Sequence, residues 1–184
     1  AALTGVTIQK LQGDTSSTEN SDFYGQNAGF LATDGAQAAL TAVSVTTAAT
    51  GGNAVVSYGE GTAVSVTDST VSTTGDHSGG IHVTGGGELT AWNVDVETQG
   101  NSSAAIRSDR GGGTLTVEDG SYVTNGTGSP AIYSTAQIAV TNAVLTANRS
   151  EAIVVEGRNS VTLTDCTVSG NMQGTYGPDS GENL

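Results

Sequence analysis

The stretch from Ser160 to Ser169 reads SVTLTDCTVS, and its apolar residues alternate with polar ones. Val161 and Leu163 lie two residues apart, Cys166 comes three residues after Leu163, and Val168 follows two residues later. Alternation by two predicts a strand with one buried face, and the step of three predicts a two-residue bend into a second strand with the same face inward. Such a unit cannot bury its apolar face alone, so it needs copies stacked above and below it.

The same spacing occurs seven times along the chain, at intervals of 23 to 37 residues. The units begin at Ala1, Ala38, Val64, Leu89, Leu115, Ile138 and Val161. A further short apolar stretch precedes each of the last six units, at Phe30, Val55, Ile81, Ile106, Ile132 and Ile153. We therefore predict an all-β fold, a parallel β-solenoid of about seven rungs with three short strands in each rung.

The chain has 184 residues and a formal net charge of −13, with only five Lys and Arg residues. This length suits one domain, and we expect residues 1–184 to form one β-helix domain. The negative charge argues against nucleic acid and anionic membrane surfaces as partners, because both attract basic patches. No apolar run is long enough for membrane insertion. Cys166 is the single cysteine, so no internal disulfide is possible, and its register predicts a small inward filler.

Two segments depart from the repeat. The first interval contains a polar, acidic insertion at residues 9–26, with Asp14, Glu19 and Asp22 around Phe23 and Tyr24. We expect it to be either a surface loop or a flap over the first rung. The C-terminal residues 171–184 read as a polar tail or as the start of a further rung.

The second residue of the predicted bend is Asp or Asn in the last five units. These residues are Asp68, Asn93, Asp119, Asn142 and Asp165, and Gly5 and Ala42 occupy the position in the first two units. Asn and Asp tolerate the left-handed backbone conformation and hydrogen-bond to their own backbone. The pattern predicts left-handed bends and a ladder of stacked side chains along the solenoid.

Three-strand rungs with a tight bend that carries Asn resemble the right-handed parallel β-helix of the pectate lyase type. The wording GGGTLTVEDGSYVTNGTGSPAIYSTAQIAVTNAVLTANRSEAIVVEG is similar to the β-helical repeats of bacterial surface and adhesin-like proteins, some of which are described as carbohydrate-binding. The resemblance extends from about Phe30 to Gly170. It implies a single-stranded right-handed parallel β-helix, whereas solenoids carry many functions.

In enzymes of the pectate lyase type the site lies on the outer face of the first strand of each rung. The outward residues of that strand are Leu31, Val56, His82, Arg107, Tyr133 and Val154. We select His82, Arg107, Asp109, Tyr133, Glu156 and Tyr58 as candidate ligand-binding residues, because this column gathers aromatic and charged groups while the other outer faces are mostly Thr, Ser and Asn. The alternative is a solvated edge with ordinary ion pairs between rungs, such as Arg107 with Glu156.

The same column is a poor catalytic site. A lyase of this type would need clustered carboxylates for calcium together with an Arg or Lys base, and here the acids are spread one per rung. A glycosidase needs two facing carboxylates, and Glu60, Asp109 and Glu156 are separated by two rungs each, about 10 Å. We assign no catalytic residue. We also assign no metal or other cofactor, although acidic loops leave calcium possible, and His77 with His82 lacks an evident third ligand.

The leading hypothesis is a non-catalytic extracellular module of a bacterial surface protein, secreted or attached to the cell surface, that binds a glycan or a partner surface protein. The alternatives are a fragment of a polysaccharide lyase or glycoside hydrolase, and a structural spacer or self-associating solenoid. End-to-end association at the open last rung would suit the last of these, because unpaired strand edges associate. Ice binding would need a regular Thr array, which pairs such as Thr114 with Thr116 form only in part. Trp92, at an outward bend position, is a further place for sugar stacking.

Overall fold

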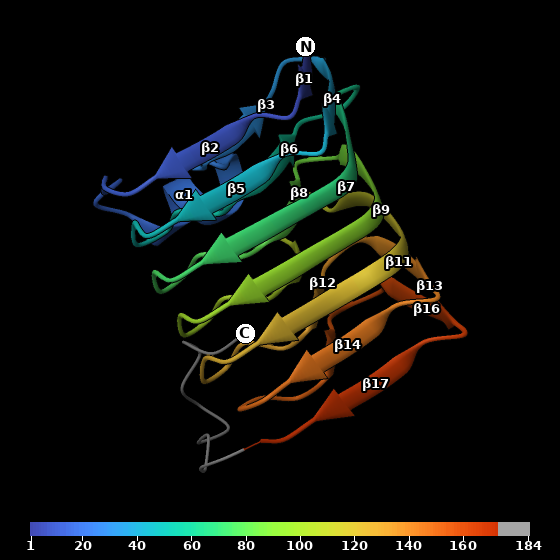
Figure 1. The fold of residues 1–184 in the computed structure, drawn as a ribbon. Helices are drawn as coiled ribbons and strands as arrows, with labels where there is room; N and C mark the ends of the chain where they lie inside the picture. Colours follow the sequence, from blue (N-terminus) through green and yellow to red (C-terminus); the bar gives the residue numbers. More distant parts are fainter. Residues whose placement is uncertain (173–184) are drawn as a thin grey trace.

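Short parallel strands stack in three columns along one axis (Figure 1), in the computed structural model that describes residues 1–172. The first column is a six-stranded sheet. Its members are β3 (Phe30–Ala32), β6 (Val55–Tyr58), β8 (Ile81–Thr84), β10 (Ile106–Ser108), β12 (Ile132–Ser134) and β15 (Ile153–Val155). This column consists of the short apolar stretches that precede the repeat units, as the sequence predicts.

The second and third columns belong to one eleven-stranded sheet that folds around the bend of each rung. The second-column strands are β1 (Ala2–Thr4), β4 (Gln37–Thr41), β13 (Gln137–Thr141) and β16 (Ser160–Thr164). The third-column strands are β2 (Thr7–Lys10), β5 (Ser44–Thr47), β14 (Val144–Ala147) and β17 (Thr167–Gly170). Three long strands pass through the bend without a break: β7 (Ala63–Thr73), β9 (Gly87–Thr98) and β11 (Gly113–Thr124).

The register of every rung is the one that the apolar spacing predicts. Leu40 pairs with Val66, Val66 with Ala91, and Ala91 with Val117 in successive parallel strands. Each of these side chains is at most 3% exposed and belongs to one continuous apolar core. The predicted all-β parallel solenoid is therefore confirmed, and its interior is filled by columns of Val, Leu, Ile and Ala.

The bends are left-handed in all seven units. Positive φ angles occur at Gly5 and Ala42, and at Asp68, Asn93, Asp119, Asn142 and Asp165. The predicted side-chain ladder is wrong in extent: within the described residues it consists of one hydrogen bond, from Nδ2 of Asn93 to Oδ1 of Asp68, 2.7 Å long.

Two positions that break the apolar pattern have separate explanations. The hydroxyl of Ser69 is buried because it accepts a hydrogen bond from the amide of Val43 and donates one to the carbonyl of Thr67. At Gly120, φ is +99°, and a Cβ would lie 2.2 Å from the carbonyl oxygen of Val94 in the preceding rung. The backbone of the neighbouring rung, rather than the size of Tyr122, therefore requires glycine.

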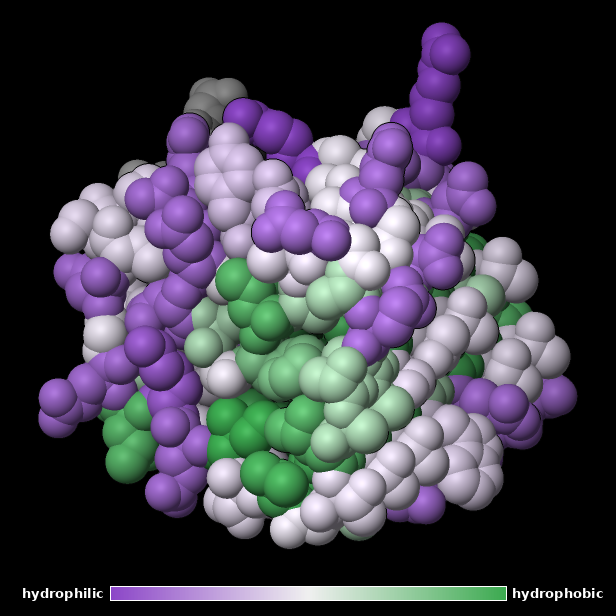
Figure 2. Space-filling view, turned by 90° about the horizontal axis from the view of Figure 1, so that it is seen from above, coloured by the Kyte–Doolittle hydropathy of each residue, from purple (hydrophilic) through white to green (hydrophobic). Residues whose placement is uncertain are grey.

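The N-terminal end of the solenoid shows its apolar interior. Leu3, Ile8 and Phe30 are only partly buried, and Val6 is 37% exposed. Figure 2 looks onto this end and shows an apolar area bordered by hydrophilic side chains. Ala1 and Val6 continue the register of the buried Ala38 and Val43, as the apolar spacing predicts, and they are exposed because the first rung has a neighbour on one side only among the described residues. Of the predicted tail, 171–184, only Asn171 and Met172 lie inside the described residues.

Candidate functional site

The selected residues lie on the outer face of the six-stranded sheet and in the loops that follow its strands. His82 pairs in register with Arg107, and Arg107 with Tyr133, so three chemically different side chains occupy adjacent rungs. Asp109 follows β10, and Glu156 follows β15. The spatial order that the sequence predicts for this column is confirmed.

The insertion covers the middle of this column. It contains the one helix of the described residues, α1 (Thr18–Tyr24), and the preceding strand β2 extends to Lys10. The expectation of a loop starting at Gln9 is thus wrong, because the insertion contains a helix and Gln9 still belongs to β2. The insertion does form a flap, but the flap does not lie over the first rung. Its helix contacts β6, β8 and β10 or the loops after them, through Tyr58, Thr84 and Arg107.

Four contacts between the helix and the sheet place α1. The hydroxyl of Thr84 donates a 2.9 Å hydrogen bond to the carbonyl of Phe23, and Asn53 donates one of 3.2 Å to the carbonyl of Ser21. The guanidinium of Arg110 lies 4.2 Å from the ring centre of Phe23. The rings of Tyr24 and Tyr58 meet edge to face, with their centres 5.7 Å apart.

The helix buries the charged middle of the predicted site. His82 is 0% exposed, and Arg107 and Asp109 are each 7% exposed. Tyr58, Tyr133 and Glu156 remain half-buried. These residues do point away from the core, as their register predicts, but the insertion takes the place of solvent over three of the six.

An ionic cluster forms under the helix. Oδ2 of Asp109 lies 2.7 Å from Nε of Arg107 and 2.9 Å from Nε2 of His82. Oδ2 of Asp22, from the helix, lies 3.0 Å from Nη2 of Arg107. The predicted alternative, an ion pair of Arg107 with Glu156, is wrong, because Arg107 is bound from two sides by Asp109 and Asp22.

Burial and charge compete in this cluster. Burial disfavours the charged form of Arg107, but the carboxylates of Asp109 and Asp22 outweigh it and raise the pKa of Arg107. Burial likewise disfavours the carboxylate of Asp109, but Arg107 and His82 outweigh it and lower the pKa of Asp109. Asp109 therefore remains ionised and serves as the counter-ion of Arg107.

The cluster is not saturated with hydrogen bonds. Within the described part of the chain, Oδ1 of Asp22, Nη1 of Arg107 and Nδ1 of His82 are buried and have no hydrogen-bond partner. Buried polar atoms are normally paired, because an unpaired one loses its bond to water without replacement. These three unpaired atoms lie together between the helix and the sheet.

Tyr133 and Glu156 form the accessible border of the cluster. Burial raises the pKa of the Tyr133 phenol, and the charge of Glu156 and a hydrogen bond to it act in the same direction. Tyr58 lies apart from this pair, against Tyr24 of the helix. The structure therefore unites His82, Arg107 and Asp109, places Tyr133 with Glu156 beside them, and leaves Tyr58 under the helix.

Asp22 is a site residue that the repeat pattern does not predict. The repeat pattern cannot place an insertion, since an insertion has no counterpart in other rungs. The one signal for it in the sequence is its position next to Phe23 and Tyr24, because only 4% of the residues in this chain are aromatic.

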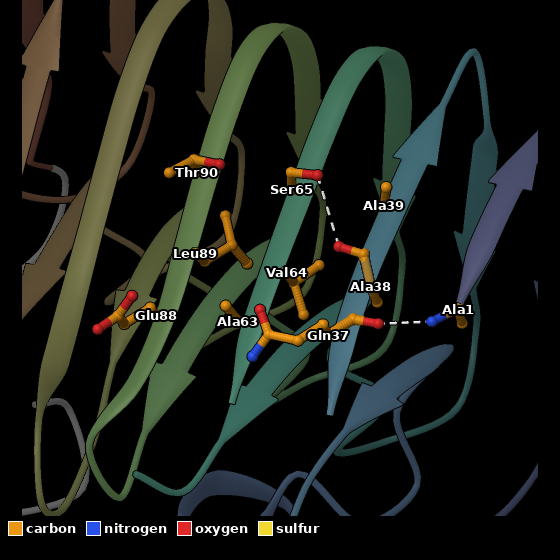
Figure 3. A pocket seen from close by; sticks show the side chains of 10 residues that line it. All are labelled: Ala1, Gln37, Ala38, Ala39, Ala63, Val64, Ser65, Glu88, Leu89 and Thr90. Atoms are coloured by element: carbon orange, nitrogen blue, oxygen red, sulfur yellow. Dashed lines mark hydrogen bonds between the residues drawn. The ribbon is translucent and has the colours of Figure 1, made fainter. Parts of the chain in front are cut away.

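A hollow lies on the outer face of β4, β7 and β9 (Figure 3). It measures about 290 Å³ and is lined mainly by small side chains such as Ala39, Ser65 and Thr90. Glu88 is its one charged side chain, and no lining residue is aromatic. Trp92, further along β9, is 47% exposed. This groove offers few groups that select a ligand.

Two further features are absent from the described residues. No group of three or more His, Cys, Asp or Glu side chains there is arranged to hold a metal ion. No helix between residues 1 and 172 has the length and apolar character that crossing a membrane requires.

A family model described as a right-handed β-helix region matches residues 4–183. The match covers nearly the whole chain and agrees with the columns of parallel strands described above. No curated protein and no solved structure matches the chain.

Proposed function

Since this chain belongs to the family of right-handed β-helix proteins, we propose that it is a non-catalytic, extracellular glycan-binding module of a bacterial surface protein. One observation carries the proposal: the outer face of the six-stranded sheet combines tyrosines, an arginine, a histidine and carboxylates on consecutive rungs. The groove of Figure 3, by contrast, has a lining of mainly small residues.

The accessible border suits a sugar. The half-buried ring of Tyr133 gives an apolar face for stacking, and Glu156 beside it gives oxygens that accept hydrogen bonds from hydroxyl groups. The rigid register of β12 against β15 fixes the distance between the two side chains. Parallel strands at about 4.8 Å also place successive rungs at a spacing that an extended polymer can follow.

The charge state of Asp109 argues against a role as the general acid of a glycosidase. A glycosidase needs one carboxyl group that retains its proton near neutral pH, and such a group has a raised pKa. Asp109 has a lowered pKa because Arg107 and His82 stabilise its ionised form. The acidic, lysine-poor composition supports an extracellular setting without identifying it.

A glycan array and calorimetry test the proposal. Tyr133→Ala should abolish binding while circular dichroism and thermal unfolding stay close to those of the wild type. Trp92→Ala is the matched control, because it removes an exposed aromatic ring from a different sheet. Loss of binding in the control but not in Tyr133→Ala would move the site to Trp92. Release of new reducing or unsaturated ends by the wild type would instead favour the lyase or hydrolase alternative.

A further inference from the structure

Asp22 is an imperfect partner for Arg107. It contacts Nη2 through Oδ2 alone, while its Oδ1 and Nη1 of Arg107 stay buried without partners among the described residues. Nε of Arg107 is already bound to Asp109. The edge of the guanidinium formed by Nη1 and Nη2 is therefore half occupied. A carboxylate that reaches both nitrogens would form the stronger bidentate pair.

The helix that carries Asp22 has little stability of its own and buries little apolar surface. It has seven residues, too few for a stable isolated helix, and Ser17 at its N-cap makes no side-chain capping bond. Ser21 is its one buried residue, and its contacts with the sheet are mostly polar. A polar pocket of about 300 Å³ lies between residues of the insertion and the turn at Thr50 and Gly51. Segments with few buried apolar contacts open at low cost.

The ends of the helix permit a hinge. Gly25 adopts the left-handed conformation at φ 65° and terminates the helix. It lies so close to β6 that a Cβ would come within 2.6 Å of Cγ1 of Val56. Gly13, on the other side of the helix, has φ 132°. Both ends of the insertion continue into strands of the solenoid, at Lys10 and Phe30, so the helix can leave the sheet and remain tethered.

We infer that α1 is a displaceable lid, in which Asp22 occupies the position on Arg107 that the carboxylate of an acidic glycan takes when it binds. The inference rests on the proposed glycan-binding function. It adds the class of ligand and the way in which the helix regulates access to the site. Lid opening exposes Arg107 and His82, and it frees the ring of Tyr58 from Tyr24. The opened face then offers Arg107 between two tyrosines, Tyr58 and Tyr133, and it also frees Arg110 from the ring of Phe23.

The ligand competes with the lid for the same guanidinium. A ligand that binds the open state alone shifts the population towards that state. Its apparent dissociation constant equals the intrinsic dissociation constant of the open state divided by the fraction of molecules that are open. A neutral sugar has no carboxylate that could replace Asp22. When the lid moves, Arg107 would therefore lose the carboxylate of Asp22 without gaining another.

Hydrogen exchange on the unaltered protein gives the first test. The probes are oligosaccharides of glucuronate or galacturonate and the same oligosaccharides with their carboxyl groups reduced to alcohols. Acidic probes should raise the exchange rate of amides in residues 18–24, and reduced probes should leave it unchanged. Protection of this segment by the acidic probe would overturn the inference, because the ligand would then bind the closed lid.

Calorimetry on two variants gives the second test. Asp22→Asn should tighten binding of the acidic probe by about tenfold, the factor that a lid closed nine times in ten imposes. Glu19→Gln is the matched control, since it removes the same charge from an exposed position of the same helix and should leave affinity unchanged. Arg107→Lys should weaken acidic probes strongly, because an ammonium lacks the bidentate fork. Thermal unfolding checks that each variant is folded.

The outcomes separate this inference from the proposed function. Equal binding of acidic and reduced probes, or an Asp22→Asn variant with wild-type affinity, overturns the lid and keeps the glycan-binding function. Binding of an acidic peptide but of no oligosaccharide overturns the ligand class together with the function. Failure of all folded variants to bind any probe overturns both.

Discussion

The amide of Ser103 donates a 2.9 Å hydrogen bond to the hydroxyl of Ser129, one rung further along the solenoid. The amide of Ser78 donates an equal bond to the hydroxyl of Ser103, so the contact repeats through the stack. Both Ser103 and Ser129 are fully buried. The turn between the third column and the next rung is thus closed by an internal column of hydroxyl groups.

Ser103→Ala should destabilise the protein by about 1–3 kcal/mol, because it leaves the buried amide of Ser78 without an acceptor. Ser72→Ala, on the outer face of β7, is the control and should change the free energy of unfolding by less than about 0.5 kcal/mol. Urea denaturation measures both. Equal effects would show that solvent replaces the lost hydroxyl.

Ala42 adopts φ 51° at a bend where other rungs carry Gly, Asn or Asp. A left-handed non-glycine residue costs about 1–2 kcal/mol, and the freedom of glycine in the unfolded chain returns part of this. Ala42→Gly should therefore raise the free energy of unfolding by up to about 1 kcal/mol. Ala39→Gly, inside β4, should lower it by about 0.5–1 kcal/mol. A destabilised Ala42→Gly variant would contradict the left-handed bend.

The sequence was sufficient to predict the fold because each rung repeats one constraint. Leu40, Val66 and Ala91 occupy one column, and the side-chain period of a strand decides which face is buried. The insertion follows no such period. Its helix is held by Thr84, Arg107 and Arg110, which belong to other rungs, so local pattern could not place it. The column of the candidate site was therefore predicted correctly, while its burial under α1 was not.

The interior register gives a third prediction. Leu115 is 0% exposed, whereas Thr114 next to it points outward and is exposed. Leu115→Asp should cost several kcal/mol, on the order expected for a buried charge without a partner. Thr114→Asp should cost less than about 1 kcal/mol, the usual range for surface changes. Comparable losses in thermal unfolding would mean that the register is shifted by one residue.

The ionic cluster predicts how stability depends on pH. The pKa of Asp109 is lower in the folded chain than its ordinary value, because Arg107 and His82 stabilise the carboxylate. A lowered pKa contributes stability that is complete above the unfolded pKa of about 3.9 and is lost as the pH falls through the folded value. Asp109→Asn should remove this component, so the free energy of unfolding should decline less steeply below about pH 4. Glu118→Gln, at an exposed position of β11, is the control for the change of charge.

Removal of the Arg107 guanidinium should lower the free energy of unfolding more than Asp109→Asn does. Arg107→Ala leaves Asp109 and Asp22 facing each other across a buried space, and breaking a buried pair from one side costs about 3–5 kcal/mol. The pKa of Asp109 should then rise towards or above its unfolded value, since its main stabilising charge is gone, and the loss of stability that Asp109 causes at acid pH should become smaller than in the wild type or reverse. Denaturant titrations between pH 3 and 7 measure both effects. An Arg107→Ala variant with wild-type stability at pH 7 would show that water already screens the cluster, and that the helix does not seal it.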